Sequence, residues 1–464
     1  METSEVICAV STAPGIGAIA VLRMSGTGCI ALTDRIFESP SGKKLTGAKA
    51  NTVHFGRILE EGCLLDEVLV TIFHAPHSFT GEESVEIACH GSLYIQQRLL
   101  QLLVNQGARL ATPGEFTQRA FLNGKMDLSQ AEAVADLIAS SSAASHRMAL
   151  KQMKGGFSAE LMKLRGELLH ITSLLELELD FSEEDVEFAD RSELRRIAGN
   201  IDELLTRLCR SFSLGNVIKN GVPVAIVGNT NVGKSTLLNA LLREDRAIVS
   251  DIAGTTRDVI EDTINLNGIT FRFIDTAGIR ATSDEVENIG IERTFAKIGQ
   301  ASVVLLLTDL NRGVEAFEEY YHQEKSRLTS DAKLIIVLNK TDQVEDLLTP
   351  QETIRLFTSG EEIIPISART GANLDRLIQE LTRTVNLNTL NTSDVIVSNV
   401  RHYEALRNAR TAIERVNEGL ESGLSGEFIS QDIRECLHYL GEITGEITTD
   451  EVLGNIFKNF CVGK

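Results

Sequence analysis

Short apolar runs separated by turns fill the first 120 residues of the chain. The runs are five to eight residues long and rich in β-branched side chains, which is typical of strands. Two other stretches place their apolar residues at helical spacing. The pattern predicts strands at residues 6–10, 18–24, 52–59, 68–74 and 84–88, and helices at 28–37 and 92–106. We therefore expect a compact α+β domain over residues 1–120.

A helical pattern begins at residue 121 and returns near the C-terminus. Apolar residues recur at helical spacing in residues 128–154, 157–179, 194–208, 400–419, 428–440 and 449–460. Thr448 and Glu451 are spaced as a capping box for the last of these helices. The helices are too amphipathic to stand alone, so we expect residues 121–216 and 384–464 to pack together as one discontinuous helical domain.

Residues 217–383, inserted between the helical halves, are predicted to form an α/β domain with a mostly parallel sheet. Its first apolar strand runs into Gly228-Asn-Thr-Asn-Val-Gly233-Lys234-Ser235, and a Leu-rich helical stretch follows. This is the strand, G-x-x-x-x-G-K-[ST] loop and helix of a phosphate cradle. The glycines let backbone N–H groups point at phosphate oxygens, Lys234 would bridge the β- and γ-phosphates, and Ser235 would hold Mg²⁺.

Three later strands end in polar motifs that complete a guanine-nucleotide site. The motifs are Asp275-Thr276-Ala277-Gly278, Asn339-Lys340-Thr341-Asp342 and Ser367-Ala368-Arg369. Asp275 can reach the Mg²⁺ shell, and the Gly278 N–H can sense the γ-phosphate. Asp342 can accept two hydrogen bonds from guanine that adenine cannot supply. The order and spacing of these motifs resemble the Ras-like GTPase superfamily, so the expected nucleotide is GTP.

One position departs from that pattern. Many such GTPases carry Gln directly after Asp-x-x-Gly to orient the attacking water, but here Ile279 occupies that place. The side chain of Ile cannot form hydrogen bonds, so another residue must handle the water.

Composition and charge indicate the class of protein and the partners that it can bind. The chain has 464 residues, of which 43% are hydrophobic and 24% charged, as in ordinary globular proteins. A formal net charge of -20 argues against nucleic-acid or membrane binding driven by overall charge, so an RNA partner must use a local basic patch. The seven Cys are scattered, so we expect a protein with reduced thiols. We find no signal-peptide pattern and no apolar run long enough to span a bilayer, so we expect a cytoplasmic protein without a membrane segment.

Five stretches together resemble one family. They are Leu22-Arg23-Met-Ser-Gly26, Ser78-Phe-Thr-Gly-Glu-Glu-Ser-Val-Glu86, Pro113-Gly-Glu-Phe-Thr-Gln-Arg-Ala-Phe-Leu-Asn-Gly-Lys125, Ile252-Ala-Gly-Thr-Thr-Arg-Asp258 and Phe460-Cys-Val-Gly-Lys464. Over essentially its whole length the chain resembles the MnmE (TrmE) family of tRNA modification GTPases. The resemblance implies a homodimer held by the N-terminal domains, which bind 5-formyl- or methylene-tetrahydrofolate as a one-carbon donor.

The resemblance also implies a reaction and a partner. With the FAD-dependent protein MnmG (GidA), in a heterotetramer-type complex, the family installs a carboxymethylaminomethyl or aminomethyl group on C5 of the wobble uridine of certain tRNAs. Folate contacts carry over to Arg23, Glu86, Lys125 and Lys464. Without the resemblance these four would be interpreted as surface charges. Cys461 is either a reactive thiol near the folate or a small, partly buried side chain, and the sequence leaves both interpretations open.

For the nucleotide, the resemblance implies potassium-dependent hydrolysis when two GTPase domains pair. K⁺ would be held by Asn231, Ser250, Ile252 and Thr255, and Mg²⁺ by Ser235 and Thr256. Glu287 matches the water-activating carboxylate, although by itself it would be interpreted as a solvent-facing acid. Arg257 and Arg280 are rival groups for neutralising charge. The GTP contacts implied in addition to Lys234 and Ser235 are Asn231, Val232, Gly233, Thr236, Ser250, Asp251, Ile252, Ala253, Gly254, Thr255, Thr256, Asp275, Thr276, Ala277, Gly278, Asn339, Lys340, Asp342, Ser367, Ala368 and Arg369.

Two other interpretations stay open on the sequence alone. An Era-like regulatory or ribosome-assembly switch would have no one-carbon chemistry. Such a switch is expected to carry an RNA-binding module such as a KH domain, and no G-x-x-G loop lies between suitable helices in the C-terminal part. A dimeric scaffold whose GTPase only times the assembly of its partner would bind folate without direct involvement of Cys461.

Overall fold

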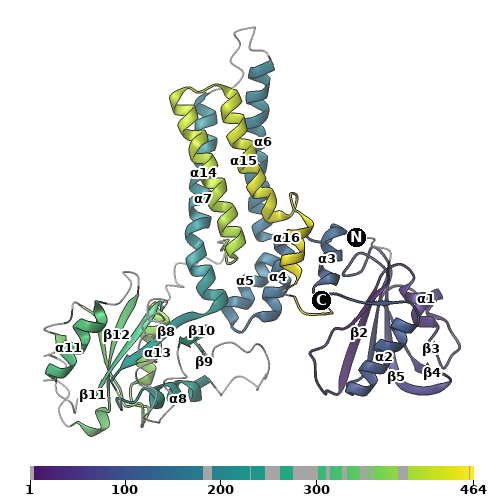
Figure 1. The fold of residues 1–464 in the computed structure, drawn as a ribbon, viewed down its shortest axis with the longest axis horizontal. Helices are drawn as coiled ribbons and strands as arrows, with labels where there is room; N and C mark the ends of the chain where they lie inside the picture. The colour runs from purple at the N-terminus through teal and green to yellow at the C-terminus, as the bar shows by residue number, and fades with distance from the viewer. Residues whose placement is uncertain are drawn as a thin grey trace. The chain divides into compact units, whose positions relative to one another are not determined.

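The computed structural model divides the chain into two compact units (Figure 1). The first contains residues 1–139, 149–206 and 404–464, and the second contains residues 140–148 and 207–403. The structure describes residues 5–180, 191–229, 231–245, 262–274, 301–309, 314–326, 332–344, 352, 354–355, 358, 360–384, 395–458 and 460–463.

A seven-stranded sheet organises the N-terminal part of the first unit. Its strand order is β3-β4-β5-β6-β2-β1-β7, and neighbouring strands are antiparallel except for the parallel pair β1 and β7. The strands are β1 Ile7–Val10, β2 Ile19–Ser25, β3 Phe37–Glu38, β4 Thr52–Glu60, β5 Cys63–Phe73, β6 Ser84–His90 and β7 Arg109–Leu110. The helices are α1 Cys29–Asp34, η1 Leu45–Gly47, α2 Leu93–Asn105 and α3 Glu115–Leu122. The predicted α+β fold is confirmed.

The two faces of this sheet differ in chemistry. Side chains alternate along β2, so Leu22 and Met24 are fully buried in the core that α2 covers, whereas Arg23 lies on the opposite face. That opposite face also carries Glu86, which is paired with Arg23 in the strand register. Large apolar side chains on the same face are exposed: Ile19, Val53, Phe55 and Leu69. One face of the sheet therefore builds the main core, whereas the other is buried at β1 under α3 and presents a surface over β4 and β5.

A buried ionic network fastens α3 to this sheet. Glu115 accepts hydrogen bonds from Arg109 Nη2 at 2.7 Å, from the Thr112 N–H at 2.9 Å and from Arg119 Nη2 at 3.1 Å. Burial by itself would raise the pKa of Glu115, but these hydrogen bonds lower it to about 2. The ionised carboxylate therefore contributes to folding.

We expect Glu115→Gln to remove a pH-dependent part of the stability. Because folding lowers the pKa of Glu115 from 4.5, the stabilisation is present above that pH and is lost as the pH falls toward 2. The melting temperatures of the wild type and the variant, measured between pH 6 and pH 3, should differ most at pH 6 and converge on acidification. A difference that stays constant over this range would contradict the expectation.

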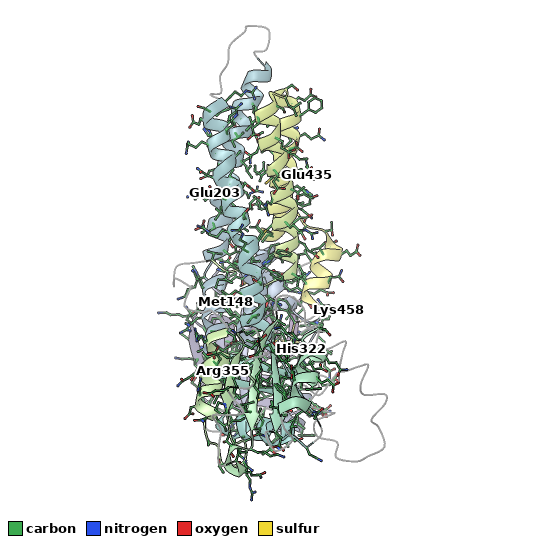
Figure 2. All side chains as sticks on the ribbon, turned by 90° about the vertical axis from the view of Figure 1, so that its left-hand side faces the viewer. Met148, Glu203, His322, Arg355, Glu435 and Lys458 are labelled. Atoms are coloured by element: carbon green, nitrogen blue, oxygen red, sulfur yellow. The ribbon has the colours of Figure 1, made fainter. Side chains whose placement is uncertain are left out.

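The rest of the first unit is a helical bundle built from two distant parts of the chain (Figure 1). Its helices are α4 Leu128–Ala139, α6 Gly156–Asp180, the first part of α7 Arg191–Asn220, most of α14 Val400–Ser422, α15 Gly426–Thr444 and α16 Asp450–Phe457. Arg195 of α7 donates to the carbonyl of Leu420 in α14 at 2.8 Å. Arg415 of α14 pairs with Asp432 and Glu435 of α15, and Figure 2 labels Glu435 there. The discontinuous helical body predicted from the sequence is confirmed.

Two local predictions for these helices are wrong. Residues 128–154 form two helices, because α4 ends at Ala139 and α5 spans Ala143–Met153. At the start of α5 the Ser145 N–H donates to Ser142 Oγ and the Ser142 N–H donates to Ser145 Oγ, both at 3.1 Å, which caps the second helix. The N-cap of α16 is Thr449, whose hydroxyl accepts from the Val452 N–H at 3.3 Å, so Thr448 does not begin a capping box.

A six-stranded sheet forms the core of the second unit. Its order is β13-β12-β11-β8-β10-β9, and every pair is parallel except β10 with β9. The elements are β8 Val222–Gly228, α8 Lys234–Asp245, β9 Asp262–Leu266, β10 Ile269–Ile274, β11 Val303–Asp309, α11 Val314–Lys325, β12 Lys333–Asn339, η3 Thr341–Gln343, β13 Glu362–Pro365 and α13 Leu374–Thr384. Helices α8 and α13 pack on one face of the sheet and α11 on the other.

This doubly wound sheet confirms the predicted fold of the inserted part. Because β8, β11, β12 and β13 are parallel, their carboxyl ends meet at one edge, where ligands bind in folds of this kind.

Among the helices that the structure describes, none is long and apolar enough to cross a membrane.

Candidate functional site

The phosphate loop joins β8 to α8 in the second unit. Asn231 and Gly233 have φ angles of 64° and 100°, which turn the chain before α8 begins at Lys234. A Cβ at position 233 would lie 2.3 Å from Asn339 Nδ2, so this position requires glycine for space as well as for its backbone angle. Val232, only 1% exposed, anchors the loop in the core. The loop therefore presents the N-terminus of α8, which is suited to bind an anion.

The ammonium group of Lys234 lies against this loop. Its Nζ donates to the carbonyl of Gly228 and, at 3.3 Å, to that of Asn229. Burial lowers the pKa of Lys234, because removal from water disfavours the charged form. A phosphate group bound here would stabilise the ammonium and offset that cost.

Asn339 joins three of the strand ends into one site. Its Nδ2 donates to the carbonyl of Val232 at 2.8 Å, and its Oδ1 accepts from the Ala368 N–H at 3.0 Å. The residue is 2% exposed, so water does not compete with these two bonds. The loops after β8, β12 and β13 are consequently held in a fixed relation to one another.

The motif residues at the other end of the site form a second polar group. Ser367 Oγ donates to Asp342 Oδ1 at 2.7 Å, which fixes the orientation of a carboxylate on an exposed residue. A carboxylate held in this way can accept two N–H donors from a guanine edge. Arg369 is exposed beside this pair in the sequence.

Asp309 is a site residue that the sequence analysis missed. Its Oδ2 pairs with Nζ of Lys340 at 2.5 Å, and Lys340 has a φ of 64°. Asp309 is 5% exposed and stands opposite Asn339 in the register of β11 and β12. The signal in the sequence is an acid at the end of a fully apolar strand. Asp309 thus fixes the side chain of Lys340 within the motif.

Several predicted site residues lie outside the part of the chain that the structure describes. They are Ser250, Asp251, Ile252, Ala253, Gly254, Thr255, Thr256, Asp275, Thr276, Ala277, Gly278, Glu287 and Lys464. Of the predicted cation ligands, Asn231 and Ser235 are described: Asn231 is an exposed residue of the phosphate loop, and Ser235 and Thr236 lie in the first turn of α8.

A second cluster lies on the open face of the N-terminal sheet. Arg23 donates from Nε at 3.0 Å and from Nη2 at 2.7 Å to the same oxygen, Oε1 of Glu86. The two side chains are 21% and 30% exposed, so the pair is accessible from solvent. Lys125 donates from Nζ to the carbonyl of Pro76 at 3.0 Å, in the loop that connects β5 to β6. The structure therefore brings Arg23 and Glu86 into contact and ties Lys125 to the adjacent loop.

The C-terminal segment docks on the same N-terminal domain. Ser11 Oγ donates to the carbonyl of Gly463 at 3.0 Å, and the Gly114 N–H donates to the carbonyl of Cys461 at 3.4 Å. A Cβ on Gly463, whose φ is 94°, would lie 2.3 Å from the carbonyl oxygen of Val10. Val10 pairs with Leu22, the neighbour of Arg23. Residues near the two ends of the sequence thus meet at the end of β1, whose partner strand β2 carries Arg23, and Cys461 of this segment is exposed.

Known families match nearly the whole length of the chain. Residues 128–461 match the family model described as the MnmE helical domain, and residues 6–125 match the GTP-binding protein TrmE N-terminus. The chain is 59% identical over 461 residues to the tRNA modification GTPase MnmE of Parabacteroides distasonis, with 99% of each chain covered. It is 58% identical over 465 residues to that of Bacteroides fragilis, again with 99% of each covered.

Among solved structures, a GTP-binding protein of Sulfolobus solfataricus in complex with GDP is more distant. It has 18% sequence identity and a TM-score of 0.28, and the match covers 49% of this chain and 68% of that chain. The family of the chain follows from the family models and the full-length relatives. They show that this chain is a GTPase that belongs to the MnmE family of tRNA modification GTPases.

Proposed function

We propose that this GTPase uses a tetrahydrofolate one-carbon donor to modify C5 of the wobble uridine in certain tRNAs. In this proposal it acts with an FAD-dependent partner of the MnmG (GidA) type and adds a carboxymethylaminomethyl or aminomethyl group. The supporting observation is that the Arg23–Glu86 pair and the segment with Cys461 lie on one domain, although they are far apart in the sequence. A folate bound there would supply the one carbon attached to C5, and an amine co-substrate would supply the nitrogen and, where present, the carboxymethyl part. The residues of this chain would bind and orient the folate.

The polar groups of this cluster suit a folate. Both hydrogen bonds from Arg23 go to Oε1 of Glu86, and no described residue donates to Oε2. A pterin presents an amino group and a ring N–H next to a carbonyl, so a carboxylate can accept from its donors and a guanidinium can donate to its carbonyl. We assign pterin recognition to Glu86 and Arg23, and contact with the remaining carboxylates to Lys125 and Lys464.

Binding of 5-formyl-tetrahydrofolate to the purified full-length protein tests this assignment. We expect the wild type to bind and Glu86→Gln to weaken binding about tenfold or more, because a charged acceptor is lost. Glu67→Gln is the matched control, since Glu67 forms a similar exposed pair with Arg57 on a neighbouring strand. Absence of binding by the wild type would refute the folate assignment.

We also propose that hydrolysis requires Mg²⁺ and K⁺ and the pairing of two GTPase domains. Mg²⁺ would be held by Ser235 and Thr256, and K⁺ by Asn231, Ser250, Ile252 and Thr255. Ile279 cannot orient water, so we assign that task to Glu287. The support from the structure is the position of Asn231, whose left-handed backbone places an exposed amide at the phosphate loop.

GTP hydrolysis is expected to be about tenfold or more faster in potassium than in sodium at equal ionic strength, because a cation fixed at the phosphates stabilises the charge of the transition state. Asn231→Ala should remove most of this difference. Asn267→Ala is the control, because Asn267 also has a positive φ, of 51°, but lies in the β9–β10 turn. Equal rates in the two salts for the wild type would exclude K⁺ from the mechanism.

Two further properties belong to this proposal. The exposed apolar side chains Ile19, Val53, Phe55 and Leu69 make the open sheet face a suitable surface for a second copy of the chain, which supports a homodimer. The tRNA substrate of the family supports a cytoplasmic site of action.

A further inference from the structure

The loop that connects β5 to β6 is fixed by hydrogen bonds at several points. Ser78 Oγ donates to the carbonyl of Glu82 at 2.6 Å within the loop. Asn123 Nδ2 donates to the carbonyl of Thr80 at 2.8 Å, and Lys125 Nζ donates to the carbonyl of Pro76 at 3.0 Å. These bonds attach both halves of the loop to the segment after α3. A loop held in this way has a defined position before any ligand binds.

This fixed loop presents a phenylalanine to the solvent. Phe79 is 38% exposed, and the guanidinium carbon of Arg23 lies 5.4 Å from the centre of its ring. Contact with the cation fixes the ring at the Arg23–Glu86 pair, because an aromatic face attracts a guanidinium.

A second aromatic ring holds Arg23 from the protein core. Phe116 of α3 is fully buried, and its ring centre lies 5.8 Å from the same guanidinium carbon. Arg23 is therefore constrained by two rings and by Oε1 of Glu86, and it makes no other described hydrogen bond. Among the described residues, no hydrogen bond engages Nη1 of Arg23 or the second oxygen of Glu86.

We propose that Phe79 forms the aromatic wall of the ligand site and stacks against a flat heterocycle whose polar edge is bound by Glu86 and Arg23. The proposal rests on the folate function proposed above, and it assigns the contact to the pterin ring. A ring with an amino-pyrimidinone edge satisfies both features, because its edge carries N–H donors and a carbonyl while its faces are apolar. Phe116 is then a positioning residue, which acts through Arg23.

The affinity of purified full-length variants for 5-formyl-tetrahydrofolate tests the wall. Phe79→Ala should weaken binding about tenfold, as expected for the loss of one stacking contact. Phe79→Tyr keeps the ring and should bind within about twofold of the wild type. Phe79→Leu keeps an apolar side chain without the ring and should fall between the two. Tyr94→Ala is the matched control, because Tyr94 is an exposed aromatic residue, at 65%, on α2 and away from the pair; its affinity should equal that of the wild type.

The possible results test two proposals separately: that Phe79 stacks against the ligand, and that the protein binds folate. If the wild type binds folate and Phe79→Ala binds equally well, the wall is refuted and the folate function stands. If the wild type does not bind, both are refuted. Melting temperatures and sedimentation of each variant identify misfolding or dissociation of subunits. If Phe79→Ala misfolds, the comparison of Phe79→Leu with Phe79→Tyr decides, and equal affinity of these two refutes stacking. A loss of affinity that follows loss of the dimer would also refute the wall, because it would assign Phe79 to a subunit contact.

Discussion

Replacing Gly233 by Ala is expected to lower the affinity for GTP about a thousandfold. The φ of 100° costs a non-glycine residue about 1–3 kcal/mol. The added Cβ would also lie 2.3 Å from Asn339 Nδ2 and displace an amide that holds Val232 and Ala368. Two lost hydrogen bonds add about 1–3 kcal/mol, and the sum corresponds to roughly three powers of ten in affinity.

Titration of the purified protein with a fluorescent GDP or GTP analogue measures this effect. Both nucleotides should be affected alike, because the loop contacts phosphates that they share. Gly199→Ala is the control, since Gly199 lies within α7 and a Cβ there would meet nothing within 4 Å. Affinity of Gly233→Ala within tenfold of the wild type would show that the loop is not the phosphate site.

Asp342→Asn is expected to switch the base that the site prefers from guanine to xanthine. The carboxylate accepts two N–H groups of guanine, and an amide would place its own N–H₂ against the guanine amino group. Loss of two charge-assisted hydrogen bonds lowers GTP affinity about a thousandfold. Xanthine carries a carbonyl in place of that amino group, so the amide can bind it. Ser367, which holds Asp342 Oδ1 at 2.7 Å, can hold Asn in the same orientation.

Competition between GTP and xanthosine triphosphate measures the exchange. The wild type should favour GTP and Asp342→Asn should favour the xanthine nucleotide, with hydrolysis preserved at saturation because the change is remote from the phosphates. Asp375→Asn on α13 is the control for loss of one negative charge in the same unit. A variant that loses GTP affinity without gaining affinity for xanthosine triphosphate would assign Asp342 a structural role.

Local patterns predicted most of the fold because they depend on neighbours in the sequence. Alternation and helical spacing identify β2, β6 and the long bundle helices, since each buries one face or one stripe. The strands β3 and β7 were missed because two residues are too few for any period, and they form only by pairing with distant strands. The break between α4 and α5 depends on hydrogen bonds between Ser142 and Ser145, which outweigh the helical propensity of the flanking Ala residues.

The sequence predicted the motifs of the sites but not the contacts between residues of different motifs. Gly233 and Asn339 follow from separate motifs, yet their contact arises only when β8 and β12 share one sheet edge. The ion pair of Asp309 with Lys340 is likewise a through-space relation that no spacing encodes. Docking of the C-terminal segment on the N-terminal domain brings together Ser11 and Gly463, which are separated by nearly the whole chain, and no local sequence pattern encodes a contact of that range.

We propose that the GTP site and the folate site assigned to Arg23 and Glu86 serve one modification of tRNA. Mass spectrometry of wobble uridines, from cells that lack the protein and carry the wild type, Gly233→Ala or Glu86→Gln, tests it most directly. We predict that the C5 modification is lost in the deletion, returns with the wild type, stays absent with Gly233→Ala and returns only in part with Glu86→Gln, at equal protein levels. Full modification in cells that carry Glu86→Gln would contradict the account, because the reaction would then not need the folate site.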